Sequence, residues 1–231
     1  MKTFAAVLSV AFLAAGMASL QAGTLCPDPT NCTLVLDQSN TSSGIGTGDF
    51  GTVNLALNTS NYTITVTIAM DPGWKIVNTG AGAGTVGFDS LGGGANNLSG
   101  LTISNISSSQ FSGYASDATN DLHFNGFGYA NDAVGLTGPS AGRSTTYSLS
   151  FTVSDGTLLT DVNQLVNPFV SGSPVVYFTV DIFDPYVGAN GTTGLVGADG
   201  KLSGVPEPAT AALLAIGGIV LFGLRFRYAK K

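Results

Sequence analysis

Positive charge is scarce in the middle of this sequence. Between Gly23 and Gly204 the only cations are Lys75, Arg143 and Lys201, against thirteen aspartates and no glutamate, which leaves a net charge of −10. A surface of this kind repels the phosphates of nucleic acids and the anionic head groups of lipids. The composition therefore excludes nucleic acid as a partner of this region.

Histidine is almost absent as well. His123 is the single histidine, in the segment DLHFNGF, where it alternates with Leu122 and Phe124. A nucleophilic triad needs a base with partners, and a zinc site needs several His or Cys ligands. The sequence offers neither set. We therefore predict no catalytic residue, no metal site and no cofactor, and we expect His123 on the face of a strand.

Paired carboxylates are the one catalytic chemistry that this composition leaves open. Asp117 with Asp121, or Asp181 with Asp184, would act as acid and base on a glycosidic bond. The second pair lies three residues apart on an expected strand, so its side chains should point to opposite faces. Calcium is a further role for aspartates in β-loops, but no Asp-x-Asp-x-Asp-Gly ligand series is present. We interpret these residues as solvated aspartates near loops.

Cysteine is limited to Cys26 and Cys32. A close pair in an exported chain favours a disulfide, whereas a metal site would need more ligands. The loop between the two cysteines is short, so the expected stabilisation is modest, about 2 kcal/mol.

The region from residue 23 to residue 204 has the pattern of an all-β domain. Thr, Val, Tyr and Phe alternate in short runs, and clusters of Gly, Asn, Asp and Ser separate these runs. Eight or nine short strands of this kind predict an antiparallel β-sandwich, jelly-roll-like or Ig-like, with a solenoid as the main alternative. The clearest strands are expected over 62–70, 144–156 and 174–185, and weaker ones over 32–37, 51–58, 85–91, 101–107 and 121–129.

Three smaller features complete this domain. Glycine-rich segments such as GANGTTG (188–194) lack the helix and lysine of a phosphate-binding loop, so we expect turns there. A single helical turn is expected around 161–166. Trp74 follows the turn residues Asp71-Pro72-Gly73, and we expect its indole to close one end of the sandwich. Contact with a sugar ligand is the alternative role for Trp74.

The N-terminal segment, residues 1–22, has the pattern of a secretory signal peptide. Lys2 precedes an apolar run from Phe4 to Leu13, and small residues lead to an expected cleavage after Ala22 or, less neatly, after Ala18. A membrane anchor that is retained is the alternative interpretation. This pattern predicts export, with signal peptidase as a partner.

The C-terminal segment, residues 205–231, has three consecutive parts. Val205-Pro206-Glu207-Pro208 contains the only glutamate of the chain, and the two prolines favour an extended backbone. The uncharged run 209–224 would form a helix about 24 Å long, short for a bilayer core of about 30 Å unless Arg225 and Arg227 extend to the interface. The basic residues of 225–231 favour the cytoplasmic side of a membrane. We expect membrane lipid to contact this helix, with residues 23–204 outside.

This order of motif, apolar helix and basic tail resembles the PEP-CTERM sorting signal of Gram-negative bacteria. The resemblance covers Val205 to Lys231. It implies that a membrane-embedded exosortase recognises Pro206, Glu207 and Pro208, that Arg225 and Arg227 retain the precursor, and that the protein is then released or transferred. It also implies an association with exopolysaccharide and biofilm matrix. An ordinary single-pass anchor is the alternative interpretation of this segment.

The sequence thus supports three hypotheses for the exported domain. The first is a non-enzymatic structural or adhesive role at the cell surface or in the matrix. The second is a carbohydrate-binding module, with Trp74 as the ligand contact and polysaccharide as the candidate partner. The third is a glycosidase or lyase that uses an aspartate pair.

Overall fold

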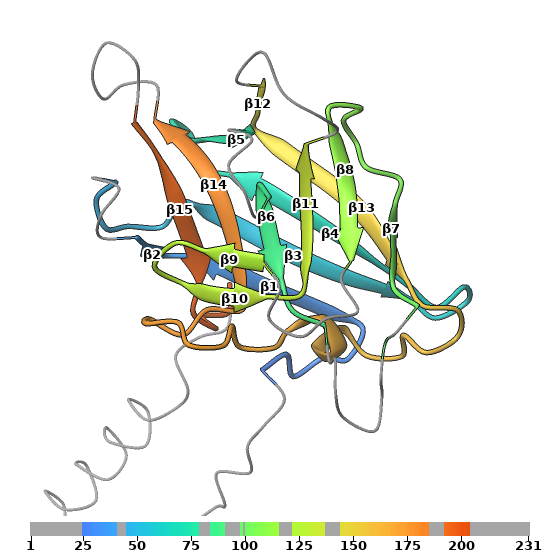
Figure 1. Cartoon of the computed structure of the whole chain (residues 1–231). Coiled ribbons are helices and arrows are strands. Elements are labelled where there is room, and N and C mark those ends of the chain that lie inside the picture. Colours follow the sequence, from blue (N-terminus) through green and yellow to red (C-terminus); the bar gives the residue numbers. More distant parts are fainter. Residues whose placement is uncertain are drawn as a thin grey trace, which may run out of the picture.

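The computed structural model describes residues 25–40, 45–78, 84–90, 98, 100–115, 122–136, 144–184 and 192–203. These residues form antiparallel strands and one 3₁₀ helix, so the expectation of an all-β domain is confirmed (Figure 1). None of the helical structure in this part has the length and apolar character needed to cross a membrane. The signal-peptide segment 1–22 and the sorting segment 205–231 lie outside the described residues.

The first sheet has five strands in the order β1-β3-β4-β13-β7. Its long central strands alternate apolar and polar residues, so one face is buried and the other is solvated. In β4 the buried positions are Ile64, Val66 and Ile68, and threonines lie between them. The bounds are Asn31–Leu36 for β1, Gly51–Asn58 for β3, Thr63–Met70 for β4, Ser148–Ser154 for β13 and Thr102–Ser104 for β7.

The second sheet is built around β14. One edge of β14 pairs with β6 through Val180 and Val86 and then with β5 through Ile182 and Ile76, while its other edge pairs with β15. Strands β11 and β8 continue beyond β6, β12 pairs with β5, and β2 pairs with β15. The bounds are Gln38–Ser39 for β2, Lys75–Asn78 for β5, Val86–Phe88 for β6, Phe111–Ala115 for β8, Asp132–Leu136 for β11, Ser144–Thr146 for β12, Phe178–Asp184 for β14 and Thr192–Ala198 for β15.

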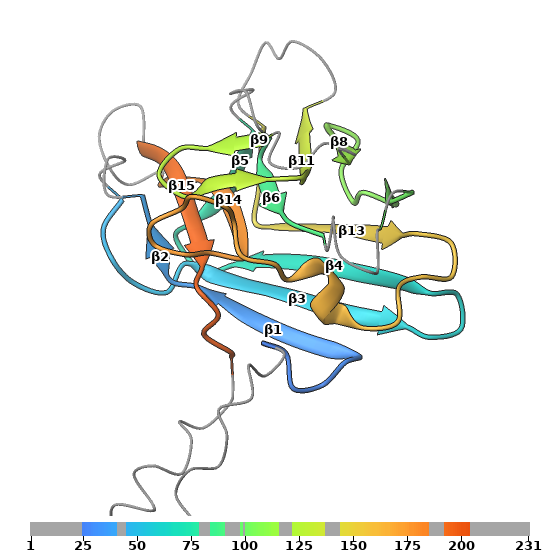
Figure 2. The same ribbon diagram turned by 60° about the horizontal axis from the view of Figure 1, so that its bottom comes forward.

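The two sheets lie face to face and share one apolar core, an arrangement consistent with the predicted β-sandwich (Figure 2). Phe88 links the layers, because its ring lies 5.7 Å from that of Phe178 in its own sheet and 5.8 Å from that of Phe151 in the facing sheet. Both contacts are stacked, and all three side chains are almost fully buried. Aromatic pairs of this kind add to the stabilisation that comes from burial alone.

A hairpin of β9 (Leu122–Phe124) and β10 (Gly128–Ala130) lies on the outer side of the second sheet (Figures 1 and 2). Its Phe124 ring packs on Gly87, where an added Cβ would overlap the ring, so a larger residue would displace this buried side chain. The hairpin buries the second face of β14 and β6, which explains why β6 has no exposed position. The hairpin and the sheet share a second apolar cluster, which consists of Phe124, Phe127, Ala130, Ala133, Phe169 and Val176.

Several strand expectations are wrong in detail. The run 144–156 divides into β12 and β13 at Tyr147, and the Tyr147 side chain is 58% exposed whereas Leu149 is buried. The run 174–185 forms a strand only from Phe178, and 121–129 contains two strands of a hairpin. The turn expected over 188–194 overlaps β15, which begins at Thr192. Strands β8 and β11 were not expected.

The helical turn expected around 161–166 is confirmed as the 3₁₀ helix η1, Val162–Leu165. The Asp161 side chain caps its start by accepting a hydrogen bond from the backbone of Asn163, and Gln164 accepts one in return from the backbone of Asp161. This reciprocal capping box satisfies donors that a helix start leaves free.

Candidate functional site

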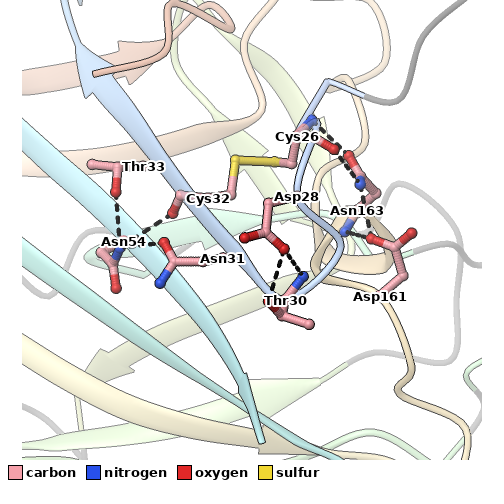
Figure 3. Close-up of a disulfide and its surroundings, with 9 residues drawn as sticks. All are labelled: Cys26, Asp28, Thr30, Asn31, Cys32, Thr33, Asn54, Asp161 and Asn163. Carbon is pink, nitrogen blue, oxygen red and sulfur yellow. Dashed lines mark hydrogen bonds between the residues drawn. A yellow bond between two sulfur atoms is a disulfide. The ribbon is translucent and has the colours of Figure 1, made fainter. Parts of the chain in front are cut away.

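The disulfide between Cys26 and Cys32 is confirmed, with a Cα–Cα distance of 5.4 Å (Figure 3). Asn163 of η1 holds the first cysteine. Its side-chain oxygen accepts a hydrogen bond from the Cys26 backbone N–H at 2.8 Å, and its amide nitrogen donates to the Cys26 carbonyl at 3.0 Å. Asp161 fixes the same amide nitrogen at 2.8 Å. The start of the described chain is therefore fixed by a covalent bond and by η1.

Residues 201–203 lie along the edge of β1 that does not pair with β3. The Val35 backbone N–H donates to the Lys201 carbonyl at 2.8 Å, and the Ser203 backbone N–H donates to the Thr33 carbonyl at 2.8 Å. Leu25 lies close by, because a Cβ added at Gly200 would come within 2.9 Å of its Cδ1 atom. Both ends of the described chain thus meet at one strand. We call β1, the Cys26–Cys32 loop and residues 201–203 the junction.

A salt bridge adds to the junction. Lys201 Nζ lies 2.9 Å from Asp49 Oδ1, and this hydrogen bond raises the pKa of the lysine. Both side chains are about half exposed, so the pair adds little to stability. Backbone pairing and the disulfide are the main contributions here.

We expect replacement of both cysteines, Cys26→Ser with Cys32→Ser, to lower the free energy of unfolding by about 2 kcal/mol, because the disulfide restricts the unfolded chain. Urea unfolding of both proteins measures the difference. A reductant should lower the stability of the parent by the same amount and leave the double variant unchanged. Equal stability of the parent with and without reductant would contradict the expectation.

The sorting residues predicted from the sequence, Val205, Pro206, Glu207, Pro208, Arg225 and Arg227, lie outside the described residues. The last described residue, Ser203, is two positions before Val205 and is hydrogen-bonded to β1. The motif therefore follows the junction with Gly204 as the only intervening residue.

Trp74 lies at the border of the core. Its ring meets that of Phe50 edge-on, with centroids 5.1 Å apart and an interplanar angle of 79°, and its backbone N–H donates to the Asp71 carbonyl in the expected turn. The side chain is partly buried against the core between the sheets. The adjacent Lys75 places its Nζ 4.9 Å from the ring centre of the exposed Tyr147. The contacts of Trp74 are those of a residue that closes the edge of the core.

His123 lies on an exposed strand face, as expected. It is in β9, and its ring lies 4.7 Å from that of Tyr129 on β10. The expected pair of Asp117 and Asp121 lies outside the described residues. Asp181 is buried in β14 on the face that the hairpin covers, where it is opposite Leu195. These residues do not form a shared constellation within the described part of the chain.

A different carboxyl pair, Asp89 and Asp132, was not identified from the sequence. Asp132 opens β11 and lies opposite Phe88, the last residue of β6, so Asp89 follows at the same end of the sheet. Asp89 is 7% exposed and Asp132 is 1% exposed. The backbone N–H of Ser90 donates to Asp132 Oδ2 at 3.0 Å, whereas Asp89 Oδ1 is buried without a hydrogen-bond partner.

Burial controls the charge of this pair. Two effects together raise the pKa of Asp89 to about 7: burial, which contributes most, and the negative charge of Asp132. Burial also raises the pKa of Asp132 to about 6, against the opposing effect of its hydrogen bonds from Ser90. Both carboxyl groups therefore keep a proton to a higher pH than an exposed aspartate does. No local pattern around residues 89 or 132 marks this pair, because strand pairing alone brings the two together.

Comparisons with known proteins add no relative. No family model matches the chain, and neither the curated proteins nor the solved structures contain a match.

Proposed function

We propose that this chain is the precursor of an exported protein that an exosortase sorts to the cell surface or extracellular matrix, where it has a non-enzymatic structural or adhesive role. The sorting signal would be 205–231, with a helix over 209–224 that holds the precursor in the inner membrane. The exported body would be a β-sandwich of the jelly-roll or Ig type, cleaved from the signal peptide 1–22.

The junction is the observation that carries this proposal. The start and the end of the β body are both bound to β1, so a signal peptide and a sorting signal would leave the body at one place. The disulfide at this place supports folding in an oxidising compartment. Such a body can face away from the membrane on a short connection while its terminal segments are processed.

The non-enzymatic role is supported by the burial of Asp89 and Asp132. This carboxyl pair, the one with strongly raised pKa values in the described residues, lies beneath the surface, where a polysaccharide chain cannot reach it. A structural or adhesive role does not require accessible titratable groups.

The sorting step is tested in the native host with two variants, Glu207→Ala and a deletion of residues 225–231. We expect the parent to reach the surface or the medium as a form shortened at both ends, and both variants to remain at the membrane with the C-terminal segment attached. Cell fractionation and mass spectrometry of the mature termini measure this. Asp71→Ala, which removes an exposed acidic side chain from a turn of the body, is the matched control and should behave as the parent does. Surface delivery of both sorting variants with the parental termini would refute the proposal.

A further inference from the structure

One side-chain oxygen of Asp89 indicates a property of this protein beyond the proposed structural or adhesive role. Asp89 Oδ1 is fully buried and has no hydrogen-bond partner, in a residue that is more than nine-tenths buried. A buried carboxylate oxygen without a donor is costly, and native structures rarely leave one unsatisfied. Among the described residues no donor completes this position, and a bound cation is one group that would do so.

The printed hydrogen bonds of two described neighbours, Ser90 and Asn167, do not reach Asp89 Oδ1. The backbone and hydroxyl of Ser90 both serve Asp132. The backbone N–H and side-chain amide of Asn167 donate to the Asp89 carbonyl, at 3.3 and 3.4 Å, and so do not reach its carboxyl group. The two cations whose side chains the structure describes are engaged far from the pair in the fold, Lys75 with Tyr147 and Lys201 with Asp49.

Both carboxyl groups are buried at the same end of the second sheet. Asp89 follows β6, Asp132 opens the neighbouring strand β11, and the Asp132 carboxylate contributes, after burial, to the raised pKa of Asp89. Oxygen atoms with negative charge and no donors are the ligands that hard cations prefer, and calcium accepts irregular sets of six to eight oxygens that include backbone carbonyls and water. Magnesium demands near-ideal octahedral geometry and keeps several waters, which suits a buried pair less well.

We propose that Asp89 and Asp132 are the carboxylate ligands of a calcium site at the end of strands β6 and β11. This site differs from the absence of metal that the sequence predicted, because its ligands lie 43 positions apart and are brought together only by the pairing of these strands. Two carboxylates give a weak site, with a dissociation constant on the order of 10⁻⁴ to 10⁻³ M, the range of extracellular calcium modules. The site would stabilise the end of the second sheet.

The test uses the purified protein at fixed pH, first with EDTA and then with 10 mM CaCl₂. We expect calcium to raise the midpoint of thermal unfolding of the parent by about 3 to 10 °C. Asp89→Asn and Asp132→Asn should each lose this shift. NaCl at matched ionic strength and MgCl₂ should produce much smaller shifts, which controls for general screening of an acidic surface.

Asp155→Asn is the matched control. Asp155 is 6% exposed and also has an unpartnered buried oxygen, but it follows β13 in the facing sheet. This variant should keep the calcium response. Equilibrium dialysis of the parent with ⁴⁵Ca²⁺ gives a reading that does not depend on variant folding. The absence of bound calcium in the parent, an undiminished shift in both pair variants, or loss of the shift in Asp155→Asn as well would overturn the proposal.

Discussion

Replacement of Phe88 by alanine is expected to lower the free energy of unfolding by about 3 to 5 kcal/mol, because it removes a buried ring and leaves a cavity. The effect should be at the upper end of what single substitutions cause, since Phe88 stacks on Phe178 and Phe151 and so joins both sheets. Urea unfolding followed by fluorescence measures the loss.

Leu158→Ala is the matched control for this truncation. Leu158 is 52% exposed, so its replacement should change the stability by less than about 0.5 kcal/mol. A loss below about 1 kcal/mol for Phe88→Ala would show that the two sheets do not share the core described here.

The stability of the metal-free protein is expected to fall as the pH rises from about 4 to about 7. The pKa of Asp89 is about 7 in the folded state, whereas the pKa of an aspartate in the unfolded chain is about 4. Between these values the folded state binds more protons than the unfolded state, so each rise in pH favours unfolding. The stabilisation is complete below pH 4 and is lost above pH 7. With an allowance for solvent screening it amounts to about 2 to 4 kcal/mol.

Asp89→Asn isolates this contribution, because the amide does not titrate. In EDTA the variant should be more stable than the parent at pH 8 and should lose that advantage at pH 5. Other carboxyl groups add their own pH dependence to both proteins, so the difference between parent and variant is the quantity to measure. Asp71→Asn, at an exposed turn, should follow the parent at every pH. A parent–variant difference that does not change with pH would contradict the expectation.

Local pattern was sufficient for the parts of the fold that have one buried and one solvated face. The alternation in 62–70 and 144–156 predicted strands there, and in the resulting β4 and β13 the alternating apolar residues Ile64, Val66, Leu149 and Phe151 are buried. It failed where a strand is covered on both sides or is interrupted. The hairpin of β9 and β10 covers the outer face of β14, and the interruption at Tyr147 turns that side chain to solvent.

The sites differ in the same way. The cysteine pair could be predicted because its two members are close in sequence and the chain has no others. Asp89 and Asp132 could not, because their proximity depends on the register in which Phe88 faces Asp132. The register of two strands is determined by packing across the sheet. The residues next to Asp89 and Asp132 in the sequence do not indicate this register.

The attachment of residues 201–203 to β1 has a mechanical consequence. If the body is tethered through its C-terminal side, a pull on the chain first loads the hydrogen bonds from Ser203 to Thr33 and from Val35 to Lys201. These bonds belong to a strand that is paired along its other edge with β3 and is covalently closed at its start by the disulfide. Drag on the exported body would therefore be resisted first by a reinforced edge of the first sheet, before the load reaches β15 of the second sheet.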